Sequence, residues 1–224
     1  MALRVFHPCQ FGFKERDVRV DSATLSGGVS LSGYEDVVGT SGGGTWRADF
    51  SSAVFGGRTD DRRAETLAWR SINAAMGGGA IPVVVQFCDR LHQPINDAHT
   101  VPGTVYVTNG AAAAVTAVVN GQAGGLRATI LDIAIVSERP LIGGERFTHI
   151  HPTWGERAYE IVEVAGSRIV ISPPIRGGIK VGDPLDFDNV RCRMRRTSSA
   201  SNALSMGVFS SGSISFAEDM RPPL

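Results

Sequence analysis

Two histidines are the residues best placed for metal chemistry, because His149 and His151 lie two positions apart in the sequence. Alternate side chains of a β-strand point to the same face, as metal ligands often do. A metal site needs a third ligand, which would have to come from one of three residues elsewhere: His92, His99 and Glu145. The turn-like segment 152–155 follows directly and favours histidines that pack or form hydrogen bonds beside a turn. The sequence therefore predicts no metal site and no cofactor.

Other residues capable of chemistry form no catalytic set. The carboxylates of the same region include no pair with the spacing of a glycosidase acid and base: Asp132, Glu138, Glu156, Glu160 and Glu163. Ser199 and Ser201 lack the glycine-flanked pattern of a hydrolase nucleophile. The glycine clusters 27–28, 42–44 and 77–79 do not follow the strand–loop–helix order of a phosphate-binding loop. We therefore predict that the protein is not an enzyme.

A row of arginines is the most prominent charged motif. Arg191, Arg193 and Arg195 alternate with Cys192 and Met194, so a strand here places the arginines on one face and the apolar pair on the other. Such a row is most often a solvated sheet face, and the alternative is a charged contact with a neighbouring subunit. Two further segments are candidates for subunit contacts. One is the glycine-rich tip 39–45 with its flank, which contributes Gly42, Gly43 and Trp46, and the other is the loop 89–103.

Length and composition indicate a globular protein of 224 residues, 42% of them hydrophobic. The 22 basic and 22 acidic residues balance, so the chain as a whole is not expected to attract nucleic acid or an anionic membrane. No apolar run reaches the roughly 18 residues of a membrane-spanning helix, and the charged segment 1–20 does not resemble a signal peptide. We expect assembly in the cytoplasm. The scattered cysteines predict buried or idle thiols: Cys9, Cys88 and Cys192.

One segment, 61–76, has the period of an amphipathic helix. Its predicted apolar stripe recurs at three- and four-residue steps: Ala64, Leu67, Ala68, Ile72 and Ala75. Asp60 and Asp61 suit the positive end of the helix dipole, and the glycines 77–79 end the helix. Strand-like segments flank it at 45–50 and 81–87.

The rest of the chain predicts short strands joined by glycine turns. From residue 103 to 188 these strands are β-branched and evenly spaced, which is typical of a small barrel or sandwich. We predict a mainly β protein with two domains. Residues 1–102 and 189–224 form a β-sandwich with one flanking α-helix, and residues 103–188 form an inserted small β-barrel.

Several motifs resemble those of tail proteins encoded by tailed bacteriophages. The resemblance covers most of the chain and rests on these segments: Gly27–Gly33, Leu67–Arg70, Pro82–Val85, His151–Gly155, Tyr159–Val162, Ile171–Arg176, Arg191–Met194 and Ser213–Glu218. Glu35-Asp36-Val37-Val38 departs from the more basic version expected of the group. The resemblance implies a tail-tube or distal-tail fold that closes into six-membered rings near the tail tip or baseplate. It brings no catalytic residues.

Two functional hypotheses follow. The first is a structural virion protein that forms a hexameric ring at the distal tail end or baseplate, where it links the tail tube to the hub and tip proteins. The second is a module that binds host-surface carbohydrate through the inserted barrel, with three candidate contacts: Trp154, Tyr159 and His151. A hydrolase carried by the insert is a third hypothesis, which no catalytic set supports.

Overall fold

The computed structural model describes residues 3–22, 24–39, 42–56, 60–89, 92, 107–108, 111–112, 116–119, 124–136, 141–198, 204–205 and 209–221. Their element order runs from β1 to β17 with one α-helix, α1, so the prediction of a mainly β protein is confirmed. No helix within these ranges is both long and apolar enough to cross a membrane.

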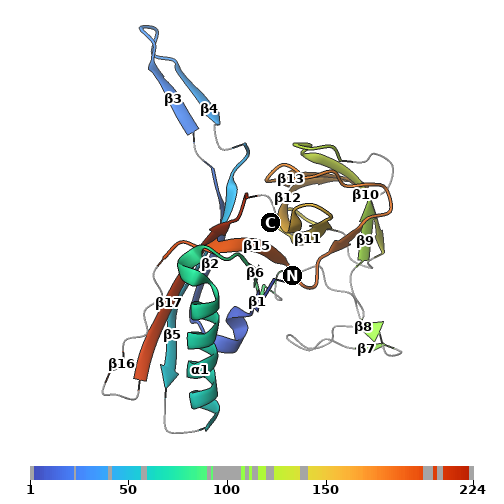
Figure 1. Ribbon diagram of the computed structural model, residues 1–224. Coiled ribbons are helices and arrows are strands. Elements are labelled where there is room, and N and C mark those ends of the chain that lie inside the picture. The colour runs from blue at the N-terminus through green and yellow to red at the C-terminus, as the bar shows by residue number, and fades with distance from the viewer. Residues whose placement is uncertain are drawn as a thin grey trace.

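A seven-stranded sheet forms the larger part of the fold (Figure 1). Its central order is β1-β6-β15-β17-β5-β2, and β16 pairs with β17 at one end. The strands are β1 (Val5–Phe6), β2 (Glu15–Asp21), β5 (Thr45–Gly56), β6 (Val83–Gln86), β15 (Arg191–Arg196), β16 (Leu204–Ser205) and β17 (Phe209–Glu218). The described strands of this part pair into this one sheet, and their arrangement as a sandwich stays a prediction.

Helix α1 (Asp60–Ala75) lies beside the sheet and matches the predicted position closely. The predicted apolar stripe is wrong at three of its five positions, because Leu67 is 47% exposed and Ala64 and Ala68 are exposed. Ile72, from the same stripe, packs against the core. The buried side instead carries Trp69, which is 1% exposed and packs edge-on against the Phe11 ring at 5.6 Å between centroids. The aromatic residues that precede β2 therefore select the buried face of the helix.

The helix ends at three glycines with positive φ, which together form the short 3-10 turn η2 (Gly77–Gly79). At Gly79, where φ is +100°, an added Cβ would lie 2.3 Å from the Arg196 carbonyl oxygen. Only glycine allows the chain to reverse so close to β15. The predicted helix stop is therefore explained by the turn toward β6.

A closed barrel is the second part of the fold, with strand order β10-β13-β12-β11-β14-β9. Its strands are β9 (Thr116–Val119), β10 (Ile130–Val136), β11 (Arg146–His151), β12 (Gly155–Ala165), β13 (Arg168–Ser172) and β14 (Pro184–Asp186). The barrel encloses its own apolar core, which includes Phe147, Ile169 and Phe187. The strands of the barrel fall within the segment 103–188, and those of the seven-stranded sheet fall outside it. Whether each part folds on its own stays a prediction.

Buried contacts join the barrel to the sheet. The Trp46 indole nitrogen on β5 donates a hydrogen bond to the Ala158 carbonyl of β12 at 2.6 Å. The Arg157 guanidinium pairs with the Glu218 carboxylate of β17 at 3.2 Å, and both side chains are 0% exposed. Because a buried ion pair depends on both partners, this pair fixes the barrel against the end of the sheet.

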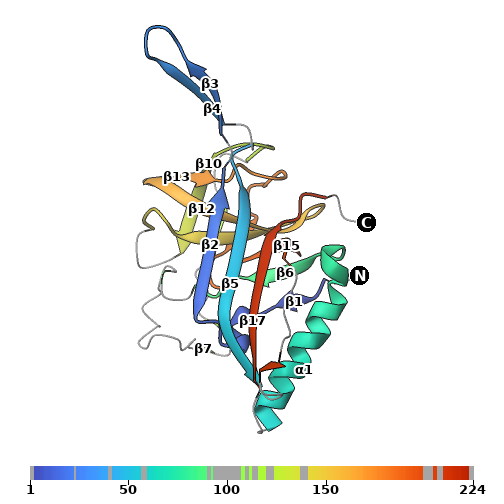
Figure 2. The ribbon, with the colours of Figure 1, turned by 90° about the vertical axis from the view of Figure 1, so that its left-hand side faces the viewer.

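Two short hairpins lie outside the sheet and the barrel. Strands β7 (Val107–Thr108) and β8 (Ala111–Ala112) form one of them. Strands β3 (Thr24–Val29) and β4 (Glu35–Gly39) form the other, here called the arm. The arm projects alone from one end of the molecule, whereas helix α1 lies at the opposite end in both views (Figures 1 and 2).

Candidate assembly surfaces

The arm carries the largest group of exposed apolar side chains on one element. Every residue of β3 and β4 is exposed. The large apolar residues of the arm are exposed as follows: Leu25 65%, Val29 69%, Leu31 112%, Tyr34 78%, Val37 53% and Val38 57%. An isolated two-stranded hairpin is only marginally stable in water, and exposed apolar patches on soluble proteins mark interaction sites. The arm is therefore a candidate contact surface.

The two faces of the arm differ in chemistry. Leu25 lies opposite Val38 in the antiparallel pair, so these two side chains share a face. Asp36 lies two residues before Val38 and belongs to the same face, and a Cβ at Gly27 would lie 3.9 Å from the Asp36 Cβ. We call this the Leu25 face. Val37 is on the other face, opposite Ser26.

The tip of the arm is held by local hydrogen bonds. The Ser30 backbone N–H donates to the Tyr34 carbonyl at 2.8 Å, and the Gly33 N–H donates to the Ser30 carbonyl at 2.8 Å. These bonds close the turn at 30–34, where Leu31 is fully exposed. The arm thus presents an ordered apolar tip.

The arm is not among the contact surfaces predicted from the sequence. Apolar residues in a predicted strand do not reveal by themselves whether they find partners in the folded chain. The usable signal was the pair Val37-Val38, which breaks the alternation expected of a strand with one buried face. The acidic pair Glu35-Asp36 before it gives the arm a net negative charge.

The outward side of helix α1 is a second exposed surface. Arg63, Leu67, Arg70 and Ala74 follow one another at three- and four-residue steps and are all exposed. We call these four residues the outer helix face. Among the described residues, neither arginine has an ion-pair partner. This face therefore offers an apolar side chain between two available positive charges.

The glycine-rich tip contacts the barrel of its own chain. A Cβ on Gly43, where φ is +89°, would lie 2.1 Å from the Pro174 Cδ. The Arg176 guanidinium donates to the Gly42 carbonyl at 3.4 Å and also to the Gly44 carbonyl. Gly42 and Gly43 are exposed on their other side, so a contact there with a neighbouring subunit stays a prediction.

Trp46, another predicted subunit contact, is 0% exposed. Its indole contacts the barrel through the Ala158 carbonyl, and the Arg146 guanidinium lies 5.3 Å from the ring centroid. Trp46 therefore faces the interior of the subunit. Of the predicted contact loop 89–103, only Asp89 and His92 belong to the described residues.

The arginine row does not form one exposed face. Arg191 is half-buried and pairs with Asp186 at 3.2 Å, while Arg193 is 5% exposed and pairs with Asp219 at 3.2 Å. Only Arg195 is exposed. The predicted alternation of exposed and buried side chains fails because the barrel covers the second face of β15, where Thr148 Oγ1 donates to the Arg191 carbonyl at 2.8 Å.

The predicted sugar-binding residues lie mostly inside the barrel. His151 is 1% exposed and Tyr159 is 0% exposed, with 2.7 Å between the His151 Nε2 and the tyrosine hydroxyl. The same hydroxyl accepts a hydrogen bond from the Arg176 backbone N–H at 3.0 Å. Trp154 is half-buried, and the Arg157 guanidinium lies 6.0 Å from its ring centroid. These positions contradict direct sugar contact by His151 and Tyr159.

His149 and His151 are both buried, and their rings contact each other on one face of β11. The rings of His149 and His151 lie 4.5 Å apart at an interplanar angle of 86°. Burial, followed by repulsion from His149, lowers the pKa of His151 to about 4. Among the described residues, no three His, Cys, Asp or Glu side chains converge as metal ligands would.

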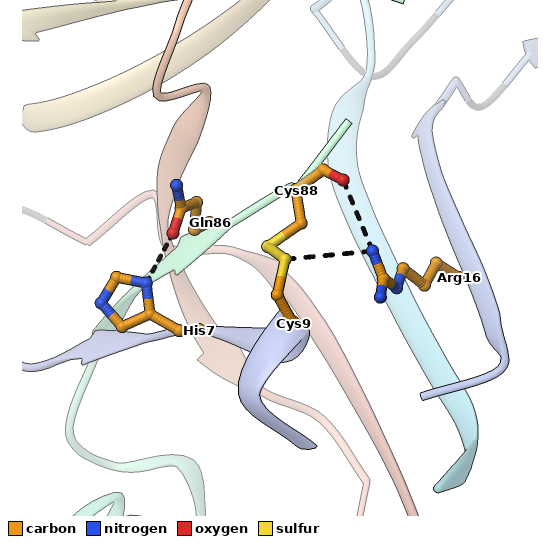
Figure 3. Close-up of a disulfide and its surroundings, with 5 residues drawn as sticks. All are labelled: His7, Cys9, Arg16, Gln86 and Cys88. Atoms are coloured by element: carbon orange, nitrogen blue, oxygen red, sulfur yellow. Dashed lines mark hydrogen bonds between the residues drawn. A yellow bond between two sulfur atoms is a disulfide. The ribbon is translucent and has the colours of Figure 1, made fainter. Parts of the chain in front are cut away.

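A disulfide joins Cys9 to Cys88, which corrects the prediction of idle thiols at these positions (Figure 3). Strand β1 pairs in parallel with β6, with Val5 opposite Val84, so the residues that follow both strands lie side by side. The two Cα atoms are 6.3 Å apart across a sequence separation of 79 residues. Arg16 donates to the Cys88 carbonyl at 3.4 Å, and His7 Nδ1 lies 2.5 Å from Gln86 Oε1 in the same region.

Cys192 remains a buried thiol, as the sequence predicts. Burial raises its pKa to about 12. Because the thiolate is the reactive form of cysteine, this residue is protected from exchange with the disulfide.

No protein-family model matches the chain, and no curated protein matches it significantly. The functional proposal therefore depends on the exposed surfaces described above, together with the resemblance of the sequence motifs.

Proposed function

We propose that the protein is a structural subunit of a bacteriophage tail, which forms a ring at the distal end or baseplate and links the tail tube to the tip proteins. The observation that carries this proposal is the arm, because six large apolar side chains extend into solvent on a hairpin that no described segment of the subunit covers. Water-exposed apolar area of this kind is stabilised when a partner covers it.

The open edge of the sheet supports the same proposal. Strand β2 is the last strand of the seven-stranded sheet on its side, so its outer edge pairs with no other described strand. At this edge the Arg146 guanidinium of the barrel donates to the Val18 carbonyl at 3.1 Å. Natural proteins protect such edges with charged residues or cover them with another chain. Strand β2 carries both acidic and basic side chains, including Glu15, Arg16 and Asp17. These charges oppose aggregation with arbitrary strands and favour pairing with a neighbour of matching charge.

The disulfide suits a protein that leaves the cytoplasm after assembly. Disulfides persist in oxidising surroundings and are uncommon in the cytosol. A released virion meets such surroundings, and the Cys9–Cys88 bond would then fasten the start of the chain to the end of β6. Cys9 is exposed and Cys88 is half-buried, so an oxidant can reach the two thiols and take up the two electrons released when the bond forms.

The test is electron microscopy of the purified protein at high concentration, with the arm present or with residues 24–38 replaced by a short Gly-Ser turn. The parent is expected to form closed rings. The arm-deleted protein is expected to remain folded, because the subunit core does not use the arm, but to lose assembled species. Parent protein that stays monomeric at all concentrations and is absent from tailed particles would refute the proposal.

A further inference from the structure

We infer that the Leu25 face of the arm docks on the outer helix face of a second copy of this chain. The inference rests on the proposed assembly function and names the two surfaces that meet. It assigns a partner to the arm, which holds six of the exposed large apolar side chains of the described residues. It also assigns a role to Arg63 and Arg70 of α1, which form no ion pair within the described part of the subunit.

The contact must be between molecules, because the two surfaces lie at opposite ends of one subunit. Both views place the arm at one end of the sheet and α1 at the other (Figures 1 and 2). A contact between two different surfaces is heterologous, so each copy still offers a free arm and a free helix after it has bound one neighbour. Such a contact extends into a closed ring or a stack, which is the arrangement a tail requires.

The arm and the outer helix face carry opposite charges. The arm, residues 24–39, carries Glu35 and Asp36 and no basic residue. The outer helix face carries Arg63 and Arg70 around Leu67. On the barrel, by contrast, the exposed Val162 adjoins Glu163 in the sequence. A carboxylate beside an apolar contact point would repel the arm, whereas the arginines attract it.

The dimensions of the two faces also agree. Along β4, Val38 and Asp36 are separated by about 7 Å, two strand residues. Along α1, Leu67 and Arg70 are separated by about 4.5 Å of helix rise, and the arginine stem spans the remainder. Gly27 has no side chain beside Asp36, so an arginine can approach that carboxylate directly while Leu67 packs against Leu25 and Val38.

Site-directed cross-linking tests the contact with a closely matched control. Val38→Cys combined with Leu67→Cys is expected to give a ladder of covalent oligomers under mild oxidation, read on a non-reducing gel. Val37→Cys combined with Leu67→Cys is the control, because Val37 is 53% and Val38 57% exposed but they occupy opposite faces of β4. The native cysteines do not contribute, since two are joined and Cys192 is buried.

Charge exchange gives a second, independent readout. Asp36→Arg is expected to raise the dissociation constant for self-association by roughly fivefold for each arginine it repels, because exposed ion pairs are individually weak. Adding Arg63→Glu and Arg70→Glu to the same chain should restore association. All of these side chains are exposed, so the variants are expected to fold normally, as circular dichroism would verify.

The outcomes separate this inference from the functional proposal. A ladder with Val38→Cys and none with Val37→Cys, together with charge rescue, supports the docking of arm on helix. Rings in the electron microscope with equal or absent ladders would overturn the docking but leave the ring proposal intact. Protein without any self-association, alone or in particles, would overturn both.

Discussion

Reduction of the Cys9–Cys88 disulfide should lower the stability of the subunit by an amount set mainly by the closed loop. The bond spans a sequence separation of 79 residues. In the chain-entropy model a loop of that length contributes about 4.5 kcal/mol at 25 °C, near the upper end of the 2–5 kcal/mol typical of native disulfides. For a protein of 150–250 residues this corresponds to a fall in melting temperature of roughly 9 to 18 °C.

Thermal unfolding with and without reductant measures this effect. The Cys9→Ser/Cys88→Ser variant is the control, because its melting temperature should match that of the reduced parent and should not respond to reductant. Thiol alkylation followed by mass spectrometry reports how far the bond is open in each sample. A fully reduced parent that melts within about 2 °C of the oxidised protein would refute the loop-closure reasoning, as would failure to recover the linked Cys9–Cys88 peptide from oxidised protein.

Three further predictions concern buried groups. Trp69→Ala should lower the free energy of unfolding by about 3–5 kcal/mol, whereas Leu67→Ala should change it by no more than about 0.5 kcal/mol, because these side chains are 1% and 47% exposed. Urea unfolding of the dilute monomer compares the two variants, and equal losses would contradict the assigned helix face. Glu218→Gln should cost about 3–5 kcal/mol in the same assay, since it leaves the fully buried Arg157 without its carboxylate; a loss below about 1 kcal/mol would argue against the junction pair. Because the pKa of His151 is about 4 in the folded protein and 6.5 ordinarily, the unfolded state binds the extra proton between these values. The contribution of His151 to the free energy of unfolding should therefore be fully present above pH 6.5 and fall by about 1.4 kcal/mol per pH unit toward pH 4. His151→Gln should remove this part of the pH dependence, as measured by urea unfolding at each pH.

Local sequence rules located the elements but not their partners. The helix was predicted at 61–76 and lies at Asp60–Ala75, because helical period and a glycine stop are properties of neighbouring residues. Its buried face was misassigned, because two stripes of the same period exist on this helix. The predicted stripe around Leu67 and the buried stripe around Trp69 share Ile72. Phe11, from a segment near the N-terminus, packs against Trp69 and favours the second stripe.

The candidate contact surfaces also depend on local patterns for their strands and on distant residues for their burial. A strand at 191–196 follows from its alternating sequence, but the burial of Arg193 does not, because the barrel and Asp219 that enclose it are distant in the chain. The apolar residues of the arm are visible in the sequence, whereas their exposure is decided by the absence of any described strand pairing on either outer edge of β3 and β4.

The mainly β class, the approximate position of the helix and the positions of its flanking strands all follow from local sequence patterns. Long-range contacts in the folded chain bring Cys9 to Cys88 and turn His151 and Tyr159 inward, and they leave the arm uncovered by the described segments. The physical reason is that periodicity and turn chemistry act over a few residues. Burial, ion pairing and disulfide formation depend on which distant segments the sheet brings side by side, as the parallel pairing of β1 with β6 does for the two cysteines.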